Sequence, residues 1–123
     1  MNTLVILKHS LLGLLLEALR LLALTNNQRE MIVSSFHISF ETHLRAPERK
    51  SGEPYFFHIF RQVLRVIQLM VQHKVVSAEL ICIILLHDAI EDAEKGKTTP
   101  FLVTSNIQLL VGDLITRCVL SLT

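Results

Sequence analysis

The chain has 123 residues, half of them hydrophobic, with 12 Lys and Arg against 11 Asp and Glu. This length suits one small domain, and a net charge of +1 excludes both the broad basic field of nucleic-acid-binding proteins and a strongly acidic tail. Four Gly and three Pro leave long stretches rich in leucine and isoleucine, which favour helices. We therefore expect a single all-α domain over residues 1–123, without a nucleic-acid partner.

The first predicted helix covers residues 3–24 and is unusually rich in leucine. Lys8, Glu17 and Arg20 interrupt its apolar run. A membrane span needs ~20 mostly apolar residues, and a signal peptide needs an uncharged apolar region, so both fit poorly. We expect residues 1–25 to form an extra helix that is buried or packed on a partner, with membrane association as the alternative. Exposed apolar surface on this helix and on the last one predicts self-association.

Further helices are predicted over residues 28–44, 56–74, 77–92 and 100–122. Asn26 and Asn27 are expected to break the chain after the first helix, and Ser77 is expected to cap the fourth, with Glu79 in its first turn. Cys82 and Cys118 lie inside apolar runs without a CxxC spacing, so we expect buried thiols in a cytoplasmic protein. The third helix has a polar stripe and an apolar one, formed by Arg61, Arg65, Gln68 and Gln72 and by Phe57, Phe60, Leu64, Ile67 and Val71.

Residues 45–55 are the one segment that is clearly not helical, since they hold two prolines and a glycine. Composition alone favours a solvated loop. The functional alternative is an anion-binding loop, because Arg49, Lys50 and Ser51 offer positive charge and hydrogen-bond donors together.

The end of the fourth helix concentrates acidic residues in an unfavourable place. After the apolar run of residues 78–86, the sequence continues His87-Asp88-Ala89-Ile90-Glu91-Asp92. Each acidic residue near a helix C-terminus destabilises the helix by ~0.3–1 kcal/mol, because that end carries partial negative charge. A divalent cation would offset this cost. His87 and Asp88, with His58 from the preceding helix, form a mixed imidazole and carboxylate set that suits Mn, Fe or Zn. A core histidine followed by a solvated helix end is an equally good interpretation.

Two motifs in this chain resemble one known family. Residues 49–58, RKSGEPYFFH, resemble the RKSGEPYxxH signature of Rel/SpoT-type (p)ppGpp hydrolase domains. Residues 85–92, LLHDAIED, resemble the LLHDxxED signature of the same family and follow in the same order. The resemblance covers roughly residues 36–123 and is weaker over 111–123. It implies an all-helical HD domain that removes the 3′-pyrophosphate from (p)ppGpp to give GDP or GTP.

The resemblance also assigns roles to individual residues. It implies that His58, His87 and Asp88 ligate Mn²⁺ or another divalent metal, and that Glu91 and Asp92 are the catalytic acids. The residues implied in binding the guanosine nucleotide are Arg49, Lys50, Ser51 and Tyr55.

The chain departs from the family pattern in three respects. Between His58 and His87 lie 28 residues, a longer spacing than the family has, and the approach to Arg49 is one residue longer. The family takes a fourth metal ligand, an Asp, from a later helix, whereas this sequence stops at Thr123. We therefore expect a partial HD domain that hydrolyses poorly. Two alternatives stay open, namely a non-catalytic nucleotide-binding or regulatory module on this scaffold, and a phosphohydrolase for another nucleotide.

Overall fold

The computed structural model describes residues 3–44 and 54–87, which form four α-helices and no β-strand. The all-α class expected from the sequence is therefore confirmed for this part of the chain. The segment 45–53, residues 88–92 of the fourth predicted helix and the whole predicted helix 100–122 lie outside the described residues. The helices are α1 (Thr3–Leu19), α2 (Asn26–Leu44), α3 (Tyr55–His73) and α4 (Ala78–Leu86).

The break between α1 and α2 differs from the prediction. α1 ends at Leu19 rather than at residue 24, and α2 begins at Asn26 rather than at residue 28. The Thr25 hydroxyl accepts a hydrogen bond from the Gln28 N–H at 3.1 Å, and the Gln28 side chain accepts one from the Thr25 N–H at 2.9 Å. This reciprocal pair of hydrogen bonds is a capping box. Asn26 therefore lies in the first turn of α2 and does not break the helix.

A tight turn reverses the chain between α3 and α4. Lys74 ends α3 in the left-handed conformation with φ 54°, and the Val75 N–H donates to the Met70 carbonyl at 3.0 Å. Such a helix end supplies hydrogen-bond donors to carbonyls of the last turn that would otherwise have none. The Ser77 hydroxyl then accepts from the Leu80 N–H at 3.2 Å, which confirms Ser77 as the N-cap of α4. As a result, α4 runs back along α3.

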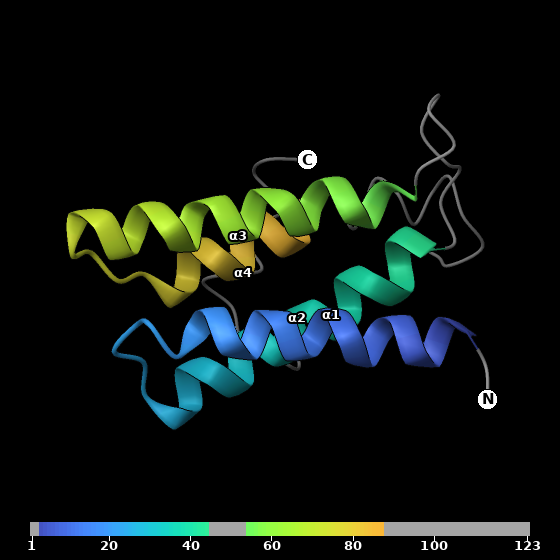
Figure 1. Cartoon of the computed structure of the whole chain (residues 1–123), viewed down its shortest axis with the longest axis horizontal. Helices are drawn as coiled ribbons and strands as arrows, with labels where there is room; N and C mark the ends of the chain where they lie inside the picture. Colours follow the sequence, from blue (N-terminus) through green and yellow to red (C-terminus); the bar gives the residue numbers. More distant parts are fainter. Residues whose placement is uncertain (1–2, 45–53, 88–123) are drawn as a thin grey trace.

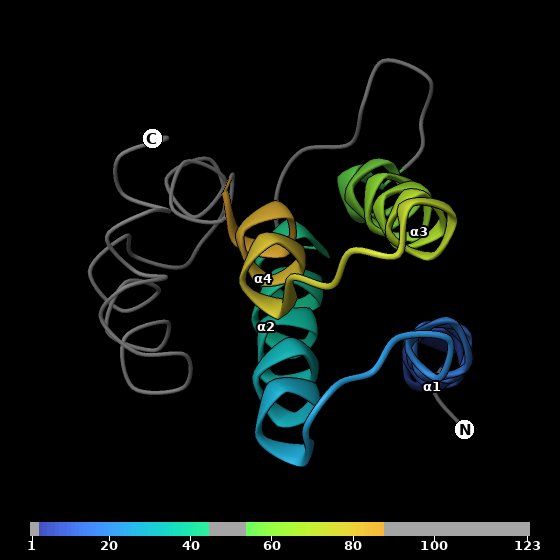
Figure 2. The same cartoon turned by 90° about the vertical axis from the view of Figure 1, so that its left-hand side faces the viewer.

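The helices are arranged in two layers. Figure 1 shows α1 and α3 side by side along the long axis, with α2 and α4 behind them. In the end-on view of Figure 2, α1 and α3 form one layer, and α2 and α4 form the other. Among the helix pairs, α2 packs most extensively on α4. Four phenylalanines join α2 to α3, with ring centroids 5.1–6.3 Å apart. They are Phe36, Phe40, Phe56 and Phe60.

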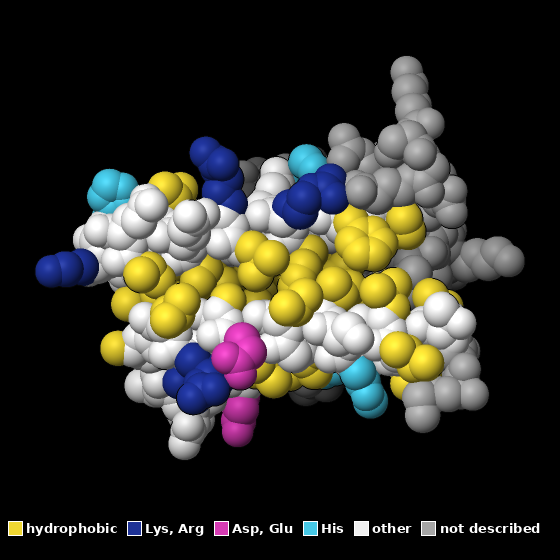
Figure 3. Space-filling model, viewed as in Figure 1, with side chains coloured by type: hydrophobic (Ala, Val, Ile, Leu, Met, Phe, Trp, Pro, Cys, Tyr) yellow, Lys and Arg dark blue, Asp and Glu magenta, His cyan; other side chains and the backbone are white. Residues whose placement is uncertain are grey.

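The buried face of α3 is shifted from the predicted one. The polar stripe is exposed as expected, but Val71 is 39% exposed, so its assignment to the core was wrong. The fully buried residues are Phe56, Ile59, Phe60, Val63, Ile67 and Met70. The shift arises because α3 packs against three helices, and more extensively against α4 and α2 than against α1. Figure 3 shows apolar side chains still visible along the seam between α1 and α3.

No helix within residues 3–44 and 54–87 has the length and apolar character needed to cross a membrane. α1 is buried on one side only, through Leu11, Leu15 and Leu19. Leu14 and Leu16 remain exposed, so the bundle buries this helix only in part, and its packing on a partner stays a prediction.

Candidate functional site

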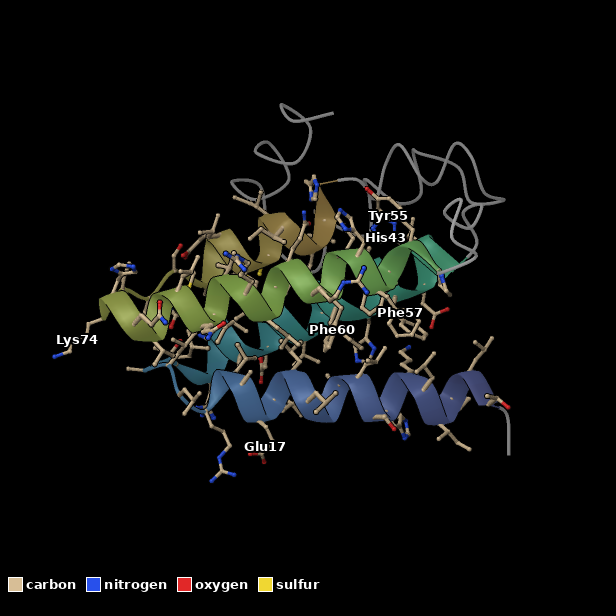
Figure 4. All side chains as sticks on the ribbon, turned by 45° about the horizontal axis from the view of Figure 1, so that its top comes forward. Glu17, His43, Tyr55, Phe57, Phe60 and Lys74 are labelled. Atoms are coloured by element: carbon tan, nitrogen blue, oxygen red, sulfur yellow. The ribbon has the colours of Figure 1, made fainter. Side chains whose placement is uncertain are left out.

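The C-terminal end of α2 and the N-terminal end of α3 lie at the same end of the molecule (Figure 1). His43, in the last turn of α2, and Tyr55, the first residue of α3, face each other there (Figure 4). Their ring centroids are 5.3 Å apart. His43 is buried with 1% of its surface exposed, and Tyr55 is partly buried. The predicted nucleotide-binding residue Tyr55 therefore packs on a histidine from another helix.

His58, one of the predicted metal ligands, lies one turn into α3. Its ring centroid is 5.6 Å from that of Tyr55, in an edge-to-face arrangement. Residues three apart on a helix share a face, which explains the contact between the two side chains. His58 is partly exposed and thus accessible to a ligand.

His87, the second predicted ligand, follows the last turn of α4. Its Nδ1 lies 2.8 Å from the Ile84 carbonyl oxygen. Because a carbonyl oxygen only accepts hydrogen bonds, Nδ1 must carry the proton in this contact. In the neutral ring, Nε2 then holds the electron pair. Metal-binding histidines commonly have this arrangement, in which a carbonyl fixes the tautomer and the orientation of the ring.

A pocket of about 500 Å³ lies between α3 and α4, and His87 lines it together with Gln62 and Arg65. His58 precedes Gln62 by four residues and Arg65 by seven, so all three belong to one face of α3. His58 shares this helix face with Gln62 and Arg65 but does not itself line the pocket. The rest of the lining is apolar and comprises Val66, Leu69, Leu80, Ile83 and Ile84.

Gln62 and Arg65 are pocket residues that the sequence analysis missed. The sequence pattern places Arg65 in the polar stripe of α3 and gives no separate signal at Gln62. Their spacing of four and seven residues from His58 was the available signal, because it places them on the same helix face as a predicted ligand.

Two of the three predicted ligands, His58 and His87, are in the described part of the chain, and imidazole nitrogens suit divalent transition metals. Within residues 3–44 and 54–87, no three His, Cys, Asp or Glu side chains come together to hold a metal ion. The remaining predicted site residues lie outside the described residues. They are Arg49, Lys50, Ser51, Asp88, Glu91 and Asp92.

Cys82 has the buried position that its sequence context predicted. Burial raises the pKa of its thiol to about 11, although the side chain of Ser35 opposes that rise. A thiol with so high a pKa is mostly protonated near neutral pH and is a poor nucleophile. Cys118 lies outside the described residues, so its predicted burial stays a prediction.

Comparison of the chain with known protein families, with curated proteins and with solved structures gave no match.

Proposed function

We propose that this chain is a metal-dependent phosphohydrolase of the Rel/SpoT kind, which removes the 3′-pyrophosphate from guanosine alarmones. The main support is the pair of sequence signatures over residues 49–58 and 85–92. The antiparallel course of α3 and α4 adds to it, since His87 lines a pocket together with residues on the His58 face of α3. The Nδ1 contact of His87 with a carbonyl is a further supporting feature.

In this proposal, His58, His87 and Asp88 hold Mn²⁺ or another divalent ion. A bound ion of this type supplies a water nucleophile near neutral pH. Glu91 and Asp92 would orient a water and accept its proton, as carboxylates close to a reacting water do. The hydrolysis consumes one water and releases pyrophosphate together with GDP or GTP.

The nucleotide is bound in this proposal by cations and by one aromatic ring. Arg49 and Lys50 offset phosphate charge, Ser51 donates a hydrogen bond, and Tyr55 contacts the nucleoside. Arg65 adds a guanidinium group on the pocket beside His87, where it can meet a further phosphate oxygen.

The test is pyrophosphate release from ppGpp by the full chain, with and without Mn²⁺. We expect Mn²⁺-dependent release of pyrophosphate, and we expect its rate in His87→Ala to fall below about a hundredth of the wild-type rate. Loss of a residue that only hydrogen-bonds to a metal ligand already lowers metal affinity or activity by ~10–100-fold. His73→Ala is the matched control, because His73 is exposed at the other end of α3.

Comparison of substrates separates this proposal from its alternatives. Nucleotide binding without hydrolysis would indicate a binding or regulatory module, and faster turnover of another nucleotide would indicate a different phosphohydrolase. Absence of both Mn²⁺ binding and ppGpp binding would refute the proposal.

A further inference from the structure

Three aromatic rings form a row from the interior of the bundle to the candidate metal site. The row begins at His43 on α2, which is 1% exposed. It continues through Tyr55, whose ring centroid lies 5.3 Å from that of His43. It ends at His58, whose ring centroid is 5.6 Å from that of Tyr55. The end of α2 and the start of α3 thus meet through side chains that end at a predicted metal ligand.

The inner end of this row is held rigidly. α2 packs on both α3 and α4, and edge-to-face phenylalanine contacts fix α2 against α3, the nearer one through Phe40, one turn before His43. His43 itself is fully enclosed, whereas Tyr55 and His58 are only partly buried. Surface side chains move between rotamers unless their neighbours hold them, so the enclosed ring restrains the outer two.

We propose that His43 is a positioning residue which, through the ring of Tyr55, fixes the orientation of the His58 imidazole. The inference rests on the proposed function only in that His58 is taken to be a metal ligand. Partners that orient a ligating histidine typically contribute ~10–100-fold to metal affinity. Loss of His43 is therefore expected to weaken metal binding although His43 touches no metal.

The first test follows the His58 ring in the metal-free protein. Imidazole signals are recorded by NMR with labelled histidine, and the His58 signal is identified by its loss in His58→Gln. We expect His43→Ala to shift or broaden the His58 signal and His43→Phe, which keeps a ring against Tyr55, to restore it. Ile32→Ala is the matched control, since Ile32 is also fully buried on α2 but lies near its other end.

The second test measures Mn²⁺ affinity of the same variants by calorimetry. We expect a loss of ~10–100-fold in His43→Ala, recovery in His43→Phe and an unchanged value in Ile32→Ala. Tyr55→Ala breaks the row at a partly exposed residue, so it answers the same question should His43→Ala fail to fold.

The two proposals fail in different ways. If folded His43→Ala and Tyr55→Ala leave the His58 signal unchanged and Mn²⁺ affinity within twofold of wild type, His43 does not position His58. If the wild-type chain binds no Mn²⁺, the proposed function fails, while the NMR signals still decide whether His43 restrains His58.

Discussion

Ser39 has an unusual environment for a polar residue. It is fully buried on α2, and its hydroxyl oxygen has no hydrogen-bond partner within residues 3–44 and 54–87. Burying an unpaired polar group costs roughly 1–3 kcal/mol, so we expect Ser39→Ala to raise the free energy of unfolding by about 1 kcal/mol. Urea denaturation measures this change.

Ser35 provides the matched control for that experiment. It is equally buried on the same helix, but its hydroxyl donates to the Met31 carbonyl at 2.8 Å. Ser35→Ala removes a hydrogen bond that is made, so it should be neutral or destabilising. A larger loss in Ser39→Ala than in Ser35→Ala would contradict this account.

At the scale of elements, the start of α2 depends on the capping box of Thr25 and Gln28. Replacement of a capping Thr by Ala typically costs ~1 kcal/mol, since it leaves a backbone N–H of the first turn without its acceptor. We expect Thr25→Ala to lower the free energy of unfolding by this amount. Thr25→Ser keeps the hydroxyl and should remain close to wild type, so equal losses in both variants would show that the cap contributes nothing.

The contact between α1 and α2 should depend on pH through His37. Lys8 of α1 bonds Glu41 of α2 at 2.8 Å, and His37 lies close to this ion pair. Burial, followed by the charges of Lys8 and His9, lowers the pKa of His37, while Glu41 opposes the shift. Because the folded-state pKa is lowered, the neutral ring is favoured on folding. Its stabilising contribution is present above pH ~6.5 and is lost as the pH falls through the folded-state pKa.

Urea denaturation between pH 7.5 and 5.5 tests this dependence. We expect the stability of the wild-type chain to fall more over that interval than the stability of His37→Gln, which cannot bind the proton. His73→Gln is the control, because His73 is exposed on α3. Identical pH profiles for wild type and His37→Gln would show that His37 does not couple to folding.

At the scale of the whole molecule, α1 has more apolar surface than the bundle covers. Leu14 is 56% exposed and Leu16 is 41% exposed. Exposed apolar side chains favour association, so we expect chains to self-associate at micromolar concentrations or above. Sedimentation velocity should detect this, and Leu14→Gln with Leu16→Gln should reduce the associated fraction.

Leu80→Gln tests whether that association is specific to α1. Leu80 has comparable exposure, 43%, but lies on α4 beside the pocket. We expect this variant to associate like the wild type. An equal reduction would instead indicate that the apolar surface of α4 contributes to association.

The sequence by itself determined the helical class, the exposed polar stripe of α3, the cap at Ser77 and the burial of Cys82. These features follow from local preferences and from periodicity, which the chain encodes residue by residue. The capping box of Thr25 and Gln28 is also a local sequence feature, although the adjacent Asn26 and Asn27 predict a break at the same place.

Only the tertiary structure decided which side of α3 is buried, because that depends on where α1, α2 and α4 pack around it. For the same reason, the local sequence pattern did not reveal that only one face of α1 is buried. It also did not reveal that Gln62 and Arg65 line a pocket with His87. The contact of His43 with Tyr55 joins the end of one helix to the start of the next. Periodicity describes one helix at a time, whereas contacts between helices depend on how their faces and ends meet in space.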